Sequence, residues 1–242
     1  MKDEIELSIV VPAYKEEKRI PIILEAIKKY IKTKEFNIET LVVVDGSPDK
    51  TAEVARSFTD TLPGLRVLER TENRGKGGTV EEGIMAAKGK YIIFTDADNS
   101  TPIEQVDKLL PFMTKYEVVI GSRYIKGGKL VVPQSIVRRV GSRVLNVIIQ
   151  TLAVRGIKDT QCGFKMFQHI AAKEIFKRTT ITNFSFDIEV LAIAKKLKYK
   201  IKEVGITWYD NPHSTVAPLG DGVKMIKDAW TIRKNLGAGK YF

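Results

Sequence analysis

Two aspartates one residue apart, Asp96 and Asp98, follow directly after an apolar run, Tyr91–Thr95. Side chains alternate along an extended chain, so both carboxylates can face one side while Ala97 faces the other. Two negative charges held so close repel each other unless a cation lies between them. Mg²⁺ or Mn²⁺ suits this position, because it accepts one or two protein carboxylates and completes its coordination with phosphate oxygens and water. The pair therefore predicts a divalent metal site that also holds phosphate.

Helix capping is the alternative explanation for the same stretch. The segment TPIE has the form of a capping box, with Thr101 as N-cap, Pro102 at the first helical position and Glu104 closing the box. Capping accounts for these residues, but Asp96 comes too early to cap the helix. Since an Asp-x-Asp pattern is common, the metal site depends on what other segments contribute.

Three other segments carry polar residues where an apolar run ends. They read VVPAYKEEKRI at Val10–Ile20, VVDGSPDKT at Val43–Thr51 and NRGKGG at Asn73–Gly78. Each has an ordinary explanation, which is turn chemistry for Gly, Asp, Ser and Pro and a solvated loop for Arg74 and Lys76. Together they place an aromatic ring, several acids and two cations at one edge of a sheet. This set of groups suits a nucleoside diphosphate.

The elements that must position these groups alternate along the chain. Strands are expected at Leu7–Pro12, Thr40–Asp45, Leu65–Leu68, Tyr91–Thr95 and Val118–Gly121. Helices are expected at Glu17–Ile31, Asp49–Phe58, Thr79–Ala87 and Pro102–Met113. This pattern predicts an α/β fold with a mainly parallel, Rossmann-like sheet flanked by helices. Ligands of such sheets bind beyond the carboxyl ends of the strands, where Asp45 and Asp96 lie.

The pattern changes after Gly121. A loop is expected at Lys126–Pro133, helices at Ser135–Val154, Phe186–Leu197 and Val223–Leu236, and a late strand at Ile201–Trp208. No repeat or convincing linker interrupts the sequence. We therefore expect one domain over residues 1–242, with a nucleotide-binding half at about 1–121 and an amphipathic half at about 122–242.

Composition narrows the class of protein. The chain has 242 residues, of which 43% are hydrophobic, which is enough for one large domain. It has one cysteine, Cys162, so a reducing compartment is expected, and its charged beginning does not resemble a signal peptide. The lone thiol is more typical of small packing than of catalysis. A net charge of +11 favours an anionic partner.

These motifs resemble glycosyltransferase family 2, whose members have the GT-A fold, and more closely its dolichyl-phosphate β-glucosyltransferase and dolichyl-phosphate mannose synthase branch. The resemblance rests on VVPAYKEE, VVVDGSPDKTAEVA, NRGKGG, TDADNST, GSRY, KDTQCGFKMF and FSFDIEVLAIAKK, in family order. The family often has two aspartates before GS, whereas Val44 precedes Asp45 here. Many members also have a lysine in the late loop, where this chain reads His213-Ser214-Thr215.

The resemblance implies roles for individual positions. Nucleotide-sugar binding falls to Pro12, Tyr14, Glu16, Val43, Asp45, Lys76, Asp96, Ala97 and Asp98. Asp96 and Asp98 would hold the metal, and Asp98, Arg123 and Asp187 would be catalytic. Asp159 and Asp187 are expected to orient groups or face the acceptor, although the alternative for Asp187 is a helix N-cap.

The activity that the resemblance implies is metal-dependent transfer of a sugar, first of all glucose from UDP-glucose, to a polyprenyl or dolichyl phosphate. GDP-mannose and UDP-N-acetylglucosamine are the alternative donors. The phosphate oxygen of the acceptor is already anionic at neutral pH, so no general base is needed, and direct displacement would invert the anomeric carbon. A phosphohydrolase with Asp96 as nucleophile is the alternative from another class. A nucleic-acid binder is not expected, because the basic residues adjoin apolar rather than interleaved aromatic positions.

A basic, amphipathic stretch supports a lipid acceptor independently. The segment from Val118 to Lys158 has eight basic residues and no acidic one, and the helix expected at Ser135–Val154 carries an apolar stripe. The arginines of this helix would bind lipid phosphates at an anionic membrane surface. The acceptor phosphate itself is assigned to Arg123, Arg138 and Arg139. The alternative is an ordinary core-packing helix. We expect a cytoplasmic protein, peripherally associated with the cytoplasmic face of a membrane.

Overall fold

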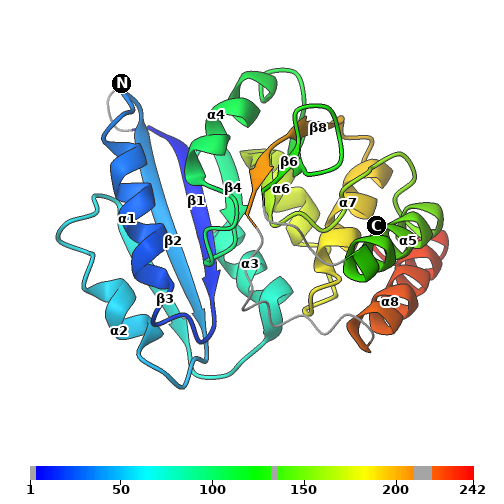
Figure 1. Ribbon diagram of the computed structural model, residues 1–242, viewed down its shortest axis with the longest axis horizontal. Helices are drawn as coiled ribbons and strands as arrows, with labels where there is room; N and C mark the ends of the chain where they lie inside the picture. Colours follow the sequence, from blue (N-terminus) through cyan, green and yellow to red (C-terminus); the bar gives the residue numbers. More distant parts are fainter. Residues whose placement is uncertain (1–3, 132–135, 210–219) are drawn as a thin grey trace.

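The computed structural model describes residues 4–131, 136–209 and 220–242, with the backbone alone at 136–140, 142–144 and 220–221. Strands and helices alternate through the first half of the chain (Figure 1). The strands are β1 (Ile5–Ala13), β2 (Asn37–Asp45), β3 (Leu65–Arg70), β4 (Tyr91–Thr95), β5 (Val118–Ser122), β6 (Lys129–Leu130), β7 (Phe164–Gln168), β8 (Ile201–Gly205) and β9 (Thr207–Trp208). The helices are α1 (Ile20–Ile31), α2 (Thr51–Arg56), α3 (Gly75–Ala86), α4 (Val106–Leu109), α5 (Ile136–Leu152), α6 (His169–Phe176), α7 (Phe186–Lys196) and α8 (Gly220–Gly237), with 3-10 turns η1 (Ile103–Gln105) and η2 (Leu110–Phe112) on either side of α4.

Seven strands form one mixed sheet in the order β3-β2-β1-β4-β7-β5-β8. All neighbours pair in parallel except β7, which lies antiparallel between β4 and β5. The expected α/β fold with a mainly parallel sheet is confirmed. The sequence did not predict β7, which comes from the second half of the chain and joins strands of the first half.

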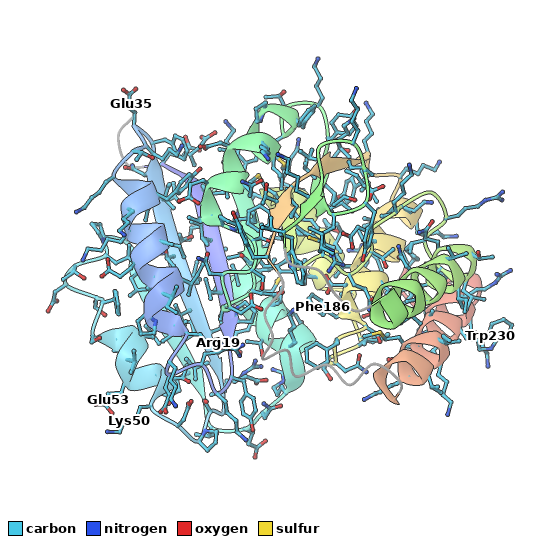
Figure 2. All side chains as sticks on the ribbon, in the orientation of Figure 1. Arg19, Glu35, Lys50, Glu53, Phe186 and Trp230 are labelled. Carbon is cyan, nitrogen blue, oxygen red and sulfur yellow. The ribbon has the colours of Figure 1, made fainter. Side chains whose placement is uncertain are left out.

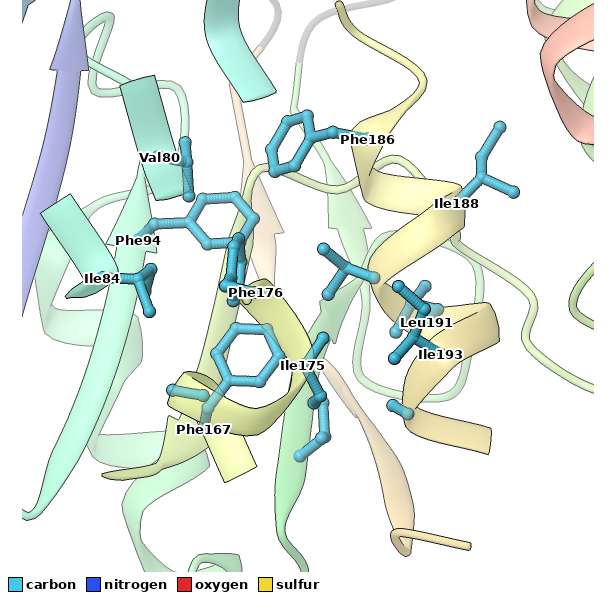
Figure 3. Packing of buried hydrophobic residues seen from close by; sticks show 14 of the residues in the cluster. Val80, Ile84, Phe94, Phe167, Ile175, Phe176, Phe186, Ile188, Leu191 and Ile193 are labelled. Carbon is cyan, nitrogen blue, oxygen red and sulfur yellow. The ribbon is translucent and has the colours of Figure 1, made fainter. Parts of the chain in front are cut away.

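The two faces of the sheet bury two separate apolar cores. Alternate residues of β4 divide between them, with Ile92 and Phe94 on the side of α3, α6 and α7, and Tyr91 and Ile93 on the side of α1, α2 and α4. Figure 3 shows Phe94 surrounded by side chains of α3, β7, α6 and α7. Its ring centroid lies 5.6 Å from that of Phe186. A side chain that follows β4 with the same orientation as Phe94 would therefore lie near α3 and α7.

The predicted capping box is wrong. Pro102 has an extended backbone, with ψ 138°, and precedes η1 as its N-cap residue without any side-chain hydrogen bond. The first helical residue is therefore Ile103, and the single helix expected at Pro102–Met113 is divided into η1, α4 and η2. Pro111 contributes to the division, because it lacks the N–H that a continuous helix would use.

The sequence predicted a loop over the glycine-rich NRGKGG segment, but only Asn73 and Arg74 lie outside a helix. α3 begins at Gly75, so Lys76 stands in its first turn. A Cβ on Gly77 would lie 2.6 Å from the carbonyl oxygen of Ile181, and the Gly77 N–H donates to the carbonyl of Thr182 at 2.7 Å. Glycine is therefore required for the close approach of this turn to the segment that leads into α7.

The second half departs from the prediction in its strands more than in its helices. The expected loop at Lys126–Pro133 contains β6, which pairs in parallel with β9, and the expected strand at Ile201–Trp208 is divided into β8 and β9. The expected helices correspond to α5, α7 and α8. α5 and α8 lie side by side at one end of the molecule, outside the sheet (Figure 1).

Candidate active site

Asp96 and Asp98 lie just beyond β4, at the carboxyl edge of the sheet. Ala97 between them is buried in the core on the α1 side. The alternation that puts Phe94 on the α3 side continues past the strand, so Asp96 emerges toward α3. Both carboxylates are partly buried. The expected opposite placement of Ala97 is thus what the structure has.

Asp96 pairs with Lys76, which lies in the first turn of α3. Its Nζ lies 2.6 Å from Asp96 Oδ1. Burial lowers the pKa of Lys76, but the charges of Asp96 and Asp187 outweigh burial and raise that pKa to about 12. Lys76 therefore stays protonated at neutral pH. It lies next to Asp96, and the resemblance assigned both residues to nucleotide-sugar binding.

The carboxylate of Asp98 is less fully compensated. Its Oδ1 accepts a hydrogen bond from the Ser100 N–H at 2.9 Å. Burial, followed by the charge of Asp96, raises the pKa of Asp98 above its ordinary value. Burial also raises the pKa of Glu16, against its ion pair with Arg19, and Asp98 and Asp96 add to that rise. Three carboxyl groups thus maintain a negative potential at this edge.

This negative potential fits a divalent cation. Within the described ranges, no three His, Cys, Asp or Glu side chains are close enough to hold a metal by themselves. The site instead offers two carboxylates, which is the usual protein contribution to a Mg²⁺ ion that also binds phosphates. The raised pKa of Asp98 is a physical sign that a positive charge would be favourable there.

Asp45 is buried beneath the start of α3. Both of its carboxylate oxygens accept hydrogen bonds, from the N–H groups of Arg74 and Gly75, each at 2.8 Å. The Arg70 guanidinium lies 3.1 Å from the same carboxylate. Asp45 therefore holds the first turn of α3, and with it Lys76, in place. The direct nucleoside contact predicted for Asp45 stays a prediction.

The other residues assigned to the nucleotide differ in accessibility. Tyr14 is exposed, with the Lys15 ammonium over its ring, and the Lys15 N–H donates to Ser47 Oγ at 2.8 Å. This bond joins the loops that follow β1 and β2. Pro12 is partly buried at the end of β1 and pairs with Val43, whose side chain is fully buried in the core. Any contact of Val43 with a ligand must therefore use its backbone.

Arg123 and Asp159 form a second charged group, beyond the end of β5. The Arg123 Nε and Nη2 donate to the two oxygens of Asp159 at 2.9 and 2.8 Å, and the Arg123 N–H donates at 2.8 Å. Burial raises the pKa of Asp159, but Arg123 outweighs burial and holds that pKa below its ordinary value. The guanidinium lies 5.2 Å from the ring centroids of both Tyr124 and Trp208. Arg123 is thus fixed in position between two aromatic rings.

The sequence offered the alternative that Asp187 is the N-cap of α7, and this alternative is wrong. The N-cap residue is Ser185, and Asp187 is buried within the first turn. Its carboxylate pairs with the ammonium of Lys165, which is fully buried on β7. Burial raises the pKa of Asp187, and Lys165 and Lys76 oppose that rise. Asp187 thus belongs to the same charged cluster as Lys76 and Asp96.

Gly163, directly before β7, contacts the site. A Cβ on Gly163 would lie 2.1 Å from Asp96 Oδ2, so only glycine leaves room for this carboxylate. The neighbouring Cys162 thiol is buried, and burial followed by the charge of Asp159 raises its pKa to about 12. A neutral thiol is a weak nucleophile, which agrees with the packing role expected for Cys162.

Some predicted residues have no described side chain. Arg138 and Arg139 lie in α5, where the structure describes only their backbone. His213-Ser214-Thr215 falls outside the described residues. The acceptor-phosphate role of these arginines and the identity of the late-loop group therefore stay predictions.

Sequence reasoning missed Lys165, Gly163 and the contact of Trp208 with Arg123. Lys165 and Gly163 lie within the KDTQCGFKMF motif, which carried the resemblance but gave no sign of a strand next to β4. The available signal was the short run Phe164–Phe167, which is apolar except for Lys165 and which favours a strand.

Comparison with protein families confirms the resemblance noted in the sequence. Residues 8–176 match the model of glycosyl transferase family 2. The chain is 37% identical over 244 residues to a dolichyl-phosphate beta-glucosyltransferase of Dictyostelium discoideum, covering 96% of this chain and 75% of the relative. It is 33% identical over 242 residues to the human enzyme of the same name, covering 94% and 75%.

Solved structures share the fold at low sequence identity. Mannosyl-3-phosphoglycerate synthase from Rubrobacter xylanophilus aligns with a TM-score of 0.72 at 18% identity, covering 98% of this chain and 75% of that one. Glucosyl-3-phosphoglycerate synthase from Mycobacterium tuberculosis, in complex with Mn²⁺, UDP and glucosyl-3-phosphoglycerate, aligns with a TM-score of 0.69 at 18% identity, covering 96% and 81%. These are GT-A glycosyltransferases, so the predicted GT-A fold is confirmed.

Proposed function

The chain belongs to glycosyl transferase family 2, and from this premise we propose that it transfers glucose from UDP-glucose to the phosphate of a dolichyl or related polyprenyl phosphate. The observation that carries the proposal is the cluster of Lys76, Asp96 and Asp98 at the carboxyl edge of the sheet. This cluster offers one cation and two carboxylates to a diphosphate and its metal. The similarity to dolichyl-phosphate beta-glucosyltransferases supports the choice of sugar and acceptor.

The acceptor explains why the site needs no general base. A phosphate monoester has a second pKa of about 6, so its oxygen is already a nucleophile at neutral pH. The task of the protein is to bring two anions, the lipid phosphate and the donor diphosphate, to opposite sides of one anomeric carbon. Lys76 is placed to bind the diphosphate, and Arg123 presents a fixed positive charge beyond β5, which is separated from β4 by β7. Direct displacement would invert the anomeric configuration.

Asp96 and Asp98 are the residues that would hold Mg²⁺ or Mn²⁺ in this proposal. When bound, such an ion supplies positive charge that stabilises the departing diphosphate. Gly163 keeps Asp96 in place by leaving room for its carboxylate, and the Ser100 N–H orients Asp98. These contacts belong to the protein itself and do not depend on the ion.

The alternatives from the sequence differ in how they fare. GDP-mannose and UDP-N-acetylglucosamine stay open as donors, because the described contacts do not distinguish the base or the sugar. The phosphohydrolase alternative required Asp96 as a free nucleophile, but its Oδ1 is paired with Lys76 and the chain belongs to a glycosyltransferase family. We therefore retain only the donor alternatives.

The structure offers a surface that suits the proposed lipid acceptor. The outer side of α8 presents Val223, Lys227, Trp230 and Lys234, which are spaced so that they lie along one stripe. Val223 is 57% and Trp230 is 55% exposed, and Figure 2 shows Trp230 pointing outward from α8. An exposed indole between lysines is typical of a helix that lies at an anionic membrane interface.

The only described acidic side chain of α8 faces away from this stripe. Asp228 accepts hydrogen bonds from Asn183 Nδ2 at 3.1 Å and Ser185 Oγ at 2.7 Å. No described helix is long and apolar enough to cross a bilayer. Because the exposed stripe of α8 carries Trp230 between Lys227 and Lys234, we extend the proposed membrane surface from α5 to α8, on the cytoplasmic face of a membrane.

The transfer assay tests the activity itself. The protein, Mn²⁺ and dolichyl phosphate are incubated with UDP-glucose, UDP-N-acetylglucosamine or GDP-mannose, and the lipid product is identified by mass spectrometry. We expect glucosyl phosphoryl dolichol from UDP-glucose, and none after chelation of the metal. Transfer of mannose alone would replace the donor, and release of phosphate from simple esters without any transfer would overturn the proposal.

Flotation with vesicles tests the membrane surface separately. We expect the protein to float with vesicles that contain phosphatidylglycerol, and Trp230→Ala to reduce this binding severalfold. Ile170→Ala is the matched control, because Ile170 is 74% exposed on α6, outside the stripe. Equal loss in both variants, or binding that is indifferent to lipid charge, would contradict the assignment of this surface.

A further inference from the structure

Lys165 is a charged residue in an apolar core. It lies on β7, directly opposite Phe94 of β4 and Ile120 of β5, so its side chain emerges on the face covered by α3 and α7. Lys165 is fully buried, and its Nζ lies 5.5 Å from the Phe94 ring centroid. Its ammonium donates to the Cys162 carbonyl at 2.6 Å and to the carboxylate of Asp187. Burying an ammonium raises the free energy of the folded state unless the charge is paired, so Lys165 depends on these two partners.

Asp187 lies between two lysines. Lys165 contacts it directly, and Lys76 is close enough to act on it electrostatically. Lys76 in turn has its direct contact with Asp96. The charges of the cluster therefore alternate in sign, from Lys165 through Asp187 and Lys76 to Asp96. The cluster connects the antiparallel strand β7 to the end of β4.

The backbone holds Lys76 near both carboxylates. The Gly77 N–H donates to the Thr182 carbonyl, so the first turn of α3 is attached to the segment that leads into α7. Lys76 and Asp187 thus cannot separate without breaking this contact. The ammonium of Lys76 still has the freedom of its four-carbon side chain, and two carboxylates compete for it.

We propose that Lys165 is a positioning residue that neutralises Asp187 and thereby leaves the ammonium of Lys76 at Asp96, where the donor diphosphate binds. Without Lys165, Asp187 becomes an uncompensated buried carboxylate and draws Lys76 away from the edge of the sheet. The effect passes through Lys76, so Lys165 need not touch any substrate. This inference rests on the proposed donor site.

UDP binding with Mn²⁺, measured by calorimetry, tests the inference without requiring turnover. Lys165→Met is compared with wild type and with the double variant Lys165→Met/Asp187→Asn, which removes both charges. Lys173→Met is the matched control, because the Lys173 ammonium donates to the carbonyls of Ile84, Met85 and Ala87 and makes no contact with the cluster. Thermal unfolding of each variant separates lost stability from lost affinity.

We expect Lys165→Met to weaken UDP binding at least tenfold, and the double variant to recover to within about threefold of wild type. In the transfer assay, Lys165→Met should raise KM for the donor more than it lowers kcat. Lys173→Met should lower the unfolding temperature while leaving the UDP affinity unchanged. Unchanged UDP affinity in Lys165→Met overturns the inference, and so does a double variant that binds as weakly as the single one. If wild type itself binds no UDP, the proposed donor fails, and the inference fails with it.

Discussion

Two charged groups lie beyond strands β4 and β5, and they differ in how fully their charges are satisfied. Arg123 and Asp159 form three hydrogen bonds with each other, and Asp159 is buried. Among the described residues, Asp96 and Asp98 share one nearby ammonium, that of Lys76, and both remain partly exposed. The pKa values follow this difference, since that of Asp159 is lowered and that of Asp98 is raised.

The difference indicates that the group of Asp96 and Asp98 can accept a charged ligand, whereas the charges of Arg123 and Asp159 already satisfy each other. A satisfied ion pair gains little from another charge, whereas two close carboxylates gain from any cation that arrives. We therefore expect the group beyond β4 to bind an added cation, and the group beyond β5 to hold Arg123 in a fixed position for the acceptor. Neutral substitutions at the two groups should then have opposite effects on stability and activity.

Asp98→Asn should give the largest effect and should change activity alone. Loss of one electrostatic contact at a reacting charge typically costs about 10²–10³-fold in rate. The unfolding temperature should not fall, because the fold disfavours the charge of Asp98 at neutral pH. Transfer assays and thermal unfolding check both parts, with the exposed Asp60→Asn as control. An undiminished rate in Asp98→Asn would remove the contrast between the two groups.

Asp159→Asn should instead reduce stability. Breaking a buried pair by removing one partner costs about 3–5 kcal/mol, because the other charge stays uncompensated. For a domain of this size that corresponds to a fall of roughly 10 °C in unfolding temperature. Urea unfolding measures the change in the free energy of unfolding, and UDP binding below the transition should persist. A variant as stable as wild type would show that Arg123 is solvated rather than paired.

Gly163→Ala should affect only the group beyond β4, because it moves one carboxylate without changing any charge. The added methyl group would overlap Asp96 Oδ2, and a displacement of about 1 Å at a reacting centre can cost about 10²-fold in rate. Gly237→Ala is the control, since an added methyl there meets no described atom within 4 Å. Donor turnover and thermal unfolding distinguish displacement from unfolding. Full activity in Gly163→Ala would mean that Asp96 has room to move.

The smallest expected effect concerns the thiol of Cys162. Charges of both groups act on this thiol, but we expect it to take no part in their chemistry. The thiol has a pKa of about 12 in the folded chain, against 9.0 in an unperturbed one. Iodoacetamide at pH 8 should therefore label only denatured protein. Because unfolding lets the thiol ionise from pH 9 upward, the free energy of unfolding should fall between pH 9 and 12. Rapid labelling of native protein would place Cys162 in the functional cluster.

Local patterns in the sequence determined the parts of the fold that depend on neighbouring residues. The apolar run Tyr91–Thr95 matches β4 at both ends, and the alternation beyond it placed Asp96 and Ala97 on opposite faces. Motif order along the chain was sufficient for the family and the fold class. Local signals failed at Thr101, where proline backbone geometry prevailed over a side-chain cap that the sequence alone favoured.

Which charged side chains meet depends on how the strands and helices are arranged in three dimensions. The pairing of Phe94 with Lys165 joins residues far apart in sequence, and the antiparallel strand that creates it interrupts an otherwise parallel order. The sequence also did not indicate that Asp45 accepts hydrogen bonds from two N–H groups at the start of α3, whether or not it contacts the nucleoside as predicted. Such contacts arise because strand order and helix packing bring distant segments together, whereas periodicity reports only what each segment does along its own length.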